Sequence, residues 1–91
     1  MRRAAKVDSN HALIVAAFRA MGCQVERWSQ PNAPDLVVSL LGLNHVVEVK
    51  TATGKQSPGQ VKWAAMWRAT VHVVRTVEDV RTLVMRWRGF S

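Results

Sequence analysis

The chain has 91 residues, with 13 Lys and Arg against 6 Asp and Glu, and a sequence pI near 11.2. This length allows one domain with a modest core, a hydrophobic fraction of 48% argues against a disordered chain, and the positive charge favours a polyanionic partner, with nucleic acid ahead of a membrane surface. One cysteine, Cys23, excludes an intrachain disulfide, and no apolar run is long enough to span a membrane, so we expect a cytoplasmic protein without a membrane partner.

The first half of the chain predicts a helix, an edge strand and a β-hairpin. We expect residues 1–7 to be a loose basic segment, and Asp8 or Ser9 to cap a well-buried helix that runs to about Met21 and stops at Gly22. Residues 25–28 fit a short edge strand, and the prolines within residues 29–34 predict a loop. Residues 36–41 and 45–51 are rich in β-formers, with Gly42-Leu43 as a type II′ turn between them.

The second half predicts a helix, a strand and a last helix. Ser57 is expected to cap a helix that begins at Pro58 and runs to about Arg68. Residues 71–75 are almost continuously apolar, as in a strand buried on both faces, and Thr76 caps a final amphipathic helix. Residues 1–91 are therefore predicted to form one α/β domain, ordered α-β-β-β-α-β-α, with a mixed central sheet flanked by helices.

Three charged residues bracket the predicted hairpin. In the register set by a Gly42-Leu43 turn, Asp35 faces Lys50 and Val37 faces Glu48, so Asp35, Glu48 and Lys50 share one face of the sheet. A charged pair among valines is costly unless it is paired or binds a metal. Two carboxylates, the backbone carbonyl of Val49 and waters would suit Mg²⁺ or Mn²⁺, beside which Lys50 could orient an attacking water.

The alternative interpretation of these charges is an ordinary Glu-x-Lys pair on a solvated strand face, with an unrelated Asp in a turn. Charged alternation on strands is common, and it would explain a bare Glu-x-Lys. The Pro-Asp before one strand and the Glu-Val-Lys that ends the next favour the metal site.

Pro34-Asp35 followed by Glu48-Val49-Lys50 resembles the signature of the PD-(D/E)xK nuclease superfamily. Thr51, Ser57-Pro58-Gly59-Gln60, Trp63 and residues 71–75 resemble its compact VRR-NUC branch. The resemblance implies a restriction-endonuclease-like core, Asp35 and Glu48 as metal ligands, Lys50 as the catalytic lysine and Gln60 as an accessory catalytic residue. It also implies a Mg²⁺- or Mn²⁺-dependent endonuclease for branched DNA such as Holliday junctions, working as a homodimer, in a standalone bacterial or bacteriophage protein.

The chain departs from this branch in its first helix, where members often carry a Glu that reaches the metal. Aligned by eye, that place is taken by Leu13; Asn10, His11 or Asp8 are possible substitutes, and the number of metals stays open. The departure keeps an alternative function in view, a nucleic-acid-binding module without cleavage activity. A basic structural protein without a nucleic-acid role ranks third.

The remaining aromatic, basic and polar residues have competing interpretations. Gln60 completes a capping box with Ser57, which alone could explain it. Core packing is favoured over stacking on unpaired bases for Trp63 and Trp67. Surplus aromatic surface at a dimer interface is expected from Trp28, Trp87 or Phe90. An exposed position is expected for His45, and a core or edge position for His72. The residues expected to contact the DNA backbone are Arg2, Arg3, Lys6, Lys55 and Lys62.

Overall fold

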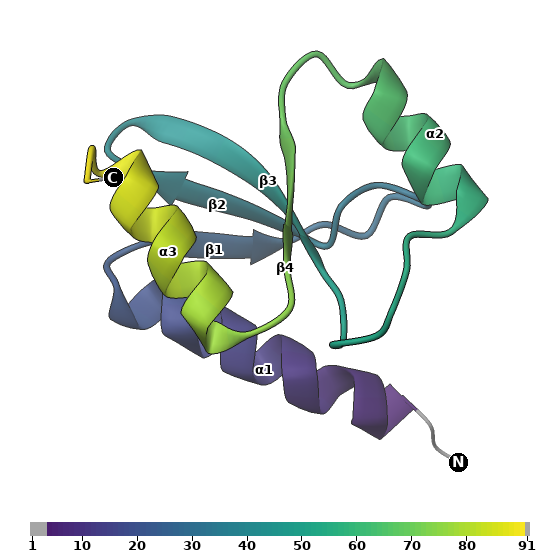
Figure 1. The fold of residues 1–91 in the computed structure, drawn as a ribbon, viewed down its shortest axis with the longest axis horizontal. Helices are drawn as coiled ribbons and strands as arrows, with labels where there is room; N and C mark the ends of the chain where they lie inside the picture. The colour runs from purple at the N-terminus through teal and green to yellow at the C-terminus, as the bar shows by residue number, and fades with distance from the viewer. Residues whose placement is uncertain (1–3, 91) are drawn as a thin grey trace.

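The computed structural model describes residues 4–90 and, within its first helix, the side chains from Asn10 onward. Its elements are α1 (Ala4–Ala20), β1 (Gln24–Arg27), β2 (Leu36–Leu40), β3 (Leu43–Val49), α2 (Pro58–Met66), β4 (Val71–Val74) and α3 (Val77–Trp87), as Figure 1 shows. The predicted α-β-β-β-α-β-α order and α/β class are confirmed. Within the described residues, no helix is long and apolar enough to cross a membrane.

The sheet has the strand order β1-β2-β3-β4. The first three strands are antiparallel neighbours, whereas β3 and β4 are parallel and are joined by the crossover that contains α2. The edge position predicted for the first strand is confirmed. The prediction that the last strand is buried on both faces is wrong, because β4 forms the other edge and only Val74 in it is buried. A run of apolar residues does not by itself separate a central strand from an edge strand.

The β2–β3 hairpin turns one residue earlier than predicted. Leu41 and Gly42 form the turn, with φ of 54° and 81°, and Leu40 pairs with Leu43. Positive φ at both central positions is the mark of a type I′ turn, so the type II′ turn at Gly42-Leu43 is wrong. Val37 consequently pairs with Val46 rather than with Glu48. The residue opposite Val37 thus shifts by two positions, which is one full side-chain period of a strand. Asp35, Glu48 and Lys50 therefore keep the common face that the sequence predicted.

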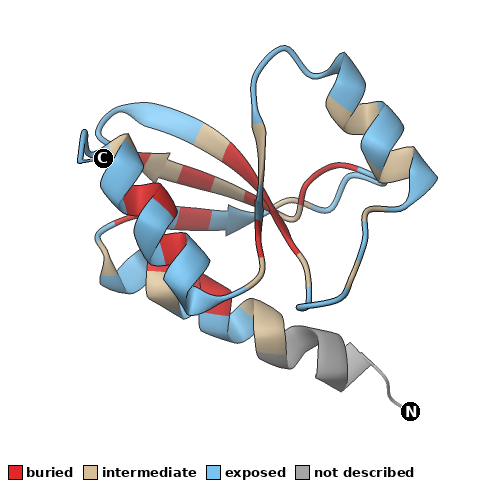
Figure 2. Ribbon diagram, in the orientation of Figure 1, coloured by how far each residue is buried: buried red, intermediate tan, exposed pale blue. Residues whose placement is uncertain are grey.

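The hydrophobic core lies between the sheet and the helices α1 and α3, which cover the same face (Figures 1 and 2). Ile14 and Phe18 of α1 are fully buried and lie one helical turn apart. Leu13, which precedes Ile14, is 62% exposed, so it lies off this buried face. The other fully buried apolar side chains that meet here are Leu36, Val38, Val47, Val80 and Val84.

Helix α1 begins earlier than the sequence predicted. Its backbone is already helical at Ala4, so Asp8 and Ser9 lie within the helix instead of capping it, and residues 4–7 are not a loose segment. Residues 1–3 lie outside the described part of the chain. The predicted stop at Gly22 is confirmed: its φ is 90°, and the Cys23 amide donates to the Phe18 carbonyl at 3.1 Å. This is the bond pattern by which glycine ends many helices.

Trp87 closes one end of the core with two histidines. The His45 ring stacks on it with centroids 3.8 Å apart, the His72 ring lies edge-on at 5.4 Å, and Phe18 stacks at 6.0 Å. The expectation that His45 is exposed is therefore wrong. For His72 a core or an edge position was expected, and it lies on the edge strand β4. Burial lowers the pKa of both histidines from the ordinary 6.5.

We predict that the domain loses stability as the pH falls below 6.5. Because the folded histidines have lowered pKa values, the unfolded chain binds more protons in that range, whereas above 6.5 both states carry neutral rings and the full stability is kept. The free energy of unfolding in urea should therefore decrease from pH 6.5 downward. A variant carrying His45→Phe, which keeps the stack on Trp87, and His72→Gln should have a shallower slope.

Glu48 has a raised pKa, so its contribution makes the free energy of unfolding fall as the pH rises, opposite to the histidines. Both the wild type and the double variant contain Glu48, so its contribution cancels when their pH dependences are compared. Parallel curves for the two proteins would contradict the role of the histidines.

Candidate functional site

Asp35 lies where β2 begins and β3 ends. It follows the buried Pro34 and directly precedes β2. Its Oδ2 accepts a hydrogen bond of 2.7 Å from the amide of Val49, the last residue of β3, and its carbonyl accepts one of 2.8 Å from the Trp28 amide. These two bonds fix Asp35 beside the end of β3, next to Glu48 and Lys50.

Glu48 is the only buried charged residue of the described chain, with 1% of its surface exposed. The Lys50 Nζ lies 3.2 Å from its Oε2 and forms an ion pair with it, and apart from Lys50 this oxygen has no polar partner among the described residues. Burial raises the pKa of the Glu48 carboxyl; the Lys50 ammonium opposes that shift and the Asp35 carboxylate adds to it. A buried carboxylate with an unsatisfied oxygen is a group that a cation would stabilise.

Gln60 connects this pair to the start of α2. Its Oε1 accepts hydrogen bonds of 2.8 Å from both the Lys50 Nζ and the Ser57 amide, while the Ser57 Oγ accepts one of 3.2 Å from the Gln60 amide. The predicted capping box is confirmed, and the same side chain also holds the lysine. Gln60 is thus at once a cap of the helix and a neighbour of the charged pair.

Helix α1 brings two further side chains to the same place. The Asn10 Nδ2 donates to the Lys50 carbonyl at 3.2 Å, and the His11 Nε2 lies 3.9 Å from the Asp35 Oδ2. Both were considered as substitutes for the first-helix Glu, whereas Leu13 faces solvent and the side chain of Asp8 lies outside the description. Arg27 lies 3.3 Å from the His11 Nδ1; sequence reasoning missed it, because nothing in a short edge strand marks its neighbours.

The donor set at this position fits a hard divalent cation with few protein ligands. Asp35 and Glu48 supply carboxylate oxygens, one of them unsatisfied, and His11 is close by. Within the described residues, no three side chains of His, Cys, Asp or Glu form a metal-binding group. Mg²⁺ is typically held by one or two carboxylates, with water and substrate phosphate completing its shell. The residues present therefore suit Mg²⁺ or Mn²⁺ better than a metal that needs a full protein cage.

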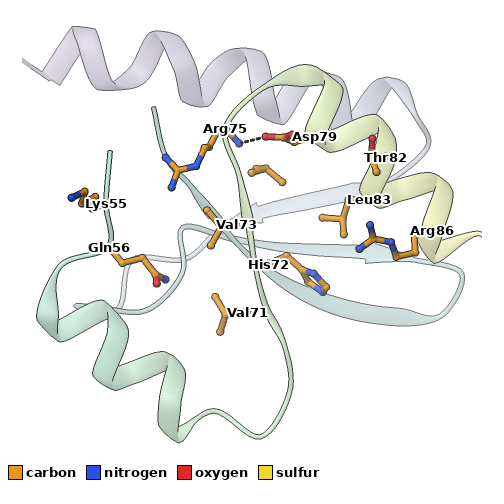
Figure 3. A pocket seen from close by; sticks show the side chains of 11 residues that line it. Lys55, Gln56, Val71, His72, Val73, Arg75, Asp79, Thr82, Leu83 and Arg86 are labelled. Carbon is orange, nitrogen blue, oxygen red and sulfur yellow. Dashed lines mark hydrogen bonds between the residues drawn. The ribbon is translucent and has the colours of Figure 1, made fainter. Parts of the chain in front are cut away.

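A groove of about 750 Å³ runs along the outer edge of β4, between the loop after Lys50 and helix α3 (Figure 3). Lys55, Arg75 and Arg86 line it, and its Val73 pairs in register with Glu48. The Arg75 Nη1 donates to the carbonyls of Thr51 and Gly54, each at 2.7 Å, and so holds the loop that carries Lys55. Asp79 also lines the groove, so its lining carries three basic side chains and one acidic one, and it adjoins the strand position paired with Glu48.

The other basic residues predicted to contact DNA have different outcomes. Lys62 is exposed on α2. Arg2 and Arg3 lie outside the described residues, as does the side chain of Lys6.

Three tryptophans form a cluster of their own between α2 and the sheet. The rings of Trp63 and Trp67 stack at 4.8 Å, and Trp28 meets them edge-on at 5.7 and 6.0 Å. None of these rings belongs to the core, and no residue of α2 is buried (Figure 2), so the core packing expected for Trp63 and Trp67 is wrong. The helical spacing of Trp63 and Trp67 could not predict this position, because spacing does not indicate against which part of the fold a helix packs.

Comparison with solved structures finds a close likeness. The chain is similar to a structure described as a VRR_NUC domain, with a TM-score of 0.73 and 28% sequence identity, covering 88% of this chain and 95% of the other. No protein-family model and no curated protein sequence matches the chain. The likeness spans nearly all of both chains, so it concerns the fold of the domain as a whole.

We predict that Ser57→Ala lowers the free energy of unfolding by about 1 kcal/mol, the usual cost of losing a helix cap. Gln60→Ala should cost more, because it removes the other bond of the capping box, from the Ser57 amide, and also takes from the Lys50 ammonium its acceptor at 2.8 Å. Urea unfolding followed by circular dichroism measures both. Lys62→Ala, on the exposed surface of the same helix, is the control and should change stability by less than about 0.5 kcal/mol. Equal costs for the two test variants would mean that the bond to Lys50 contributes nothing.

Proposed function

Because the chain has the fold of a VRR-NUC domain and is nuclease-like in type, we propose that it is a Mg²⁺- or Mn²⁺-dependent DNA endonuclease. We propose further that it hydrolyses phosphodiester bonds in branched or otherwise structured DNA, such as a Holliday junction, and works as a homodimer. The proposed catalytic residues are Asp35, Glu48, Lys50 and Gln60.

The observation that carries the proposal is the buried Glu48 carboxylate with the Lys50 ammonium 3.2 Å from it. A carboxylate and an ammonium two residues apart on a valine-rich strand are costly to bury, and they are joined here by Asp35 and Gln60. A purely structural role would be served more cheaply by apolar residues of similar size. Charged groups arranged in this way around an unsatisfied carboxylate oxygen are typical of a functional site.

In the proposed reaction, Asp35 and Glu48, with the carbonyl of Val49, would hold the cation. When bound, the cation supplies charge neutralisation at the phosphate and lowers the pKa of water. Lys50 is held by Gln60 on one side and by Glu48 on the other, so its ammonium is oriented before substrate arrives. It would orient the attacking water by hydrogen bonding and stabilise the negative charge that builds up on the phosphoryl oxygens.

The proposed partner, DNA, fits the charge of the chain. The formal net charge is +7, and the groove along β4 presents Lys55, Arg75 and Arg86 (Figure 3). Val73 in its lining pairs with Glu48 of the site. Lysine and arginine side chains that contact phosphates supply most of the sequence-independent affinity for DNA. We assign these three residues to the DNA backbone, together with Lys62 on α2.

The proposed dimer has support in one exposed apolar surface. Leu41 and Leu43 at the hairpin turn and Phe90 after α3 are each more than half exposed. The hairpin turn and the chain end after α3 lie at the same end of the molecule (Figure 1). Trp87, which was expected to be surplus aromatic surface, is instead packed against the core. An exposed apolar surface of this kind suits a two-fold interface.

We predict that Asp35→Asn, Glu48→Gln and Lys50→Met each lower the rate of DNA cleavage at least about a hundredfold, because each removes a charge at the reacting phosphate. The assay uses labelled linear, flap and four-way-junction DNA with Mg²⁺, with Mn²⁺ or with EDTA. DNA affinity measured in EDTA should stay within about threefold of the wild type, since the phosphate contacts lie on other residues. Calorimetry with Mn²⁺ alone should show lost binding in the Asp35 and Glu48 variants only.

Glu78→Gln, which makes the same carboxylate-to-amide change on the exposed surface of α3, is the matched control for these variants and should cut at close to the wild-type rate. Wild-type protein that binds DNA but cuts none of the substrates with either metal would identify the non-catalytic module instead. Variants that cut as fast as the wild type would show that the site is wrongly assigned.

We predict a dimer in light scattering at micromolar concentration, with a mass twice that of the 10.2 kDa chain. Leu43→Lys should give a single-chain mass, because a charge in an apolar interface is costly to bury. Met66→Lys introduces the same charge on another exposed apolar residue and should leave the dimer intact. A wild-type mass of one chain, unchanged by junction DNA, would exclude the dimer.

A further inference from the structure

We propose that the groove beside the tryptophan cluster binds an unpaired base of the DNA strand that is being cut. The groove is lined by Trp28, Trp67, Val37, Val46 and Thr70, among others, and has a volume of about 430 Å³. This inference rests on the proposed nuclease function and deepens it, since it selects DNA with unpaired nucleotides as the substrate class.

The cluster offers an aromatic surface that is open to a ligand. Trp67 is 40% exposed, although it stacks on Trp63 and meets Trp28 edge-on. The two partner rings hold the Trp67 ring in place, so a base that stacks on it meets a surface that is already ordered. Stacking on aromatic rings is tolerant of sequence, because every base has a π-face.

The groove lies next to the proposed catalytic residues. Val37 and Val46 pair across the hairpin. Glu48 lies two residues after Val46 on β3, and Asp35 lies two residues before Val37, directly ahead of β2, so both side chains have the side-chain period of this face. The spacing is about 7 Å, from a rise of about 3.3 Å per residue. The Trp28 amide also donates directly to the Asp35 carbonyl at 2.8 Å. A nucleotide whose base lies in the groove would therefore have a neighbouring phosphate within reach of the carboxylates.

The charges around the cluster favour a nucleic acid over an apolar peptide. Lys62 and Arg68 directly flank Trp63 and Trp67 in sequence and are both exposed, and the chain as a whole carries +7. The lining also contains residues with hydrogen-bonding groups, which are Asn44, Thr70, His45 and His72. Aromatic rings between basic side chains match the alternating bases and phosphates of a single strand. A base that is stacked and paired within a duplex cannot enter, so the occupant is an unpaired base.

The cluster has a structural role that the test must separate from this one, because it also attaches α2, which has no buried residue, to the sheet. Two substitutions at Trp67 make the separation. Trp67→Phe keeps an aromatic face for stacking, whereas Trp67→Leu keeps apolar packing without that face. Circular dichroism and urea unfolding report whether α2 stays folded in each.

The experiment measures the affinity of the full chain, in EDTA to prevent cleavage, for short labelled oligothymidylate and for an abasic strand of the same length. Both strands carry the same phosphates, so their difference reports the bases alone. The wild type should bind oligothymidylate about tenfold more tightly than the abasic strand. Trp67→Leu should remove most of this difference, and Trp67→Phe should retain most of it. Met66→Leu, at the neighbouring exposed position, should behave as the wild type.

Equal affinity of the wild type for the two strands would overturn the groove proposal, and so would equal behaviour of the Phe and Leu variants when both are folded. Cleavage of junction DNA by that same protein would show that the nuclease function holds without the groove. A chain that binds no strand and cuts no DNA would instead remove the proposed function itself.

Discussion

The burial of Glu48 is the constraint on which the candidate site depends. An ionised carboxylate in a strand of valines costs several kcal/mol unless charged or polar partners surround it. Lys50 supplies the first partner from the same strand and the same face, and Gln60 then holds the lysine. The apolar surroundings that make the carboxylate costly also strengthen every electrostatic interaction it makes. The site is therefore held together by the same environment that would make it chemically effective.

Four separate segments converge on the last residues of β3. The loop before β2 contributes Asp35, which bonds to the Val49 amide, and helix α1 contributes Asn10, which bonds to the Lys50 carbonyl. Helix α2 contributes Gln60, and β4 accepts the Lys50 amide at its Val74 carbonyl. Because each bond ends on the β3 backbone or on Lys50, the site is a property of how this one strand is enclosed.

The two faces of the sheet have different roles in the domain. On one side, α1 and α3 bury the core and supply most of the apolar contact. On the other, α2 buries none of its residues and meets the body through its cap, through Gln60 and through the tryptophan cluster. A helix that is not needed to fill the core can present its side chains to a ligand. This arrangement connects the proposed catalytic groups with the proposed base-binding groove, since both lie where α2 approaches the sheet.

The sequence alone determined the features that depend on neighbouring residues. Ser57-Pro58-Gly59-Gln60 specifies a capped helix start, Gly22 a helix stop, and the order of the elements follows from such local signals and from periodicity. Asp35, Glu48 and Lys50 could also be singled out in advance, because charged residues in a valine run and a Pro-Asp before a strand are unusual wherever they fold. Gln60 was proposed as a catalytic residue only through the resemblance to the VRR-NUC branch.

Only the tertiary structure decided the hairpin register, the layer that α2 joins and the surroundings of His45. Leu41 adopts a positive φ that its type does not favour, so the turn lies one residue earlier than glycine alone indicates. Trp63 and Trp67 have the spacing of a buried face but lie outside the core, and His45 is covered by a tryptophan 42 positions further along the chain. In each case the outcome depends on packing between segments far apart in sequence, and a local pattern carries no information on which distant surface will cover it.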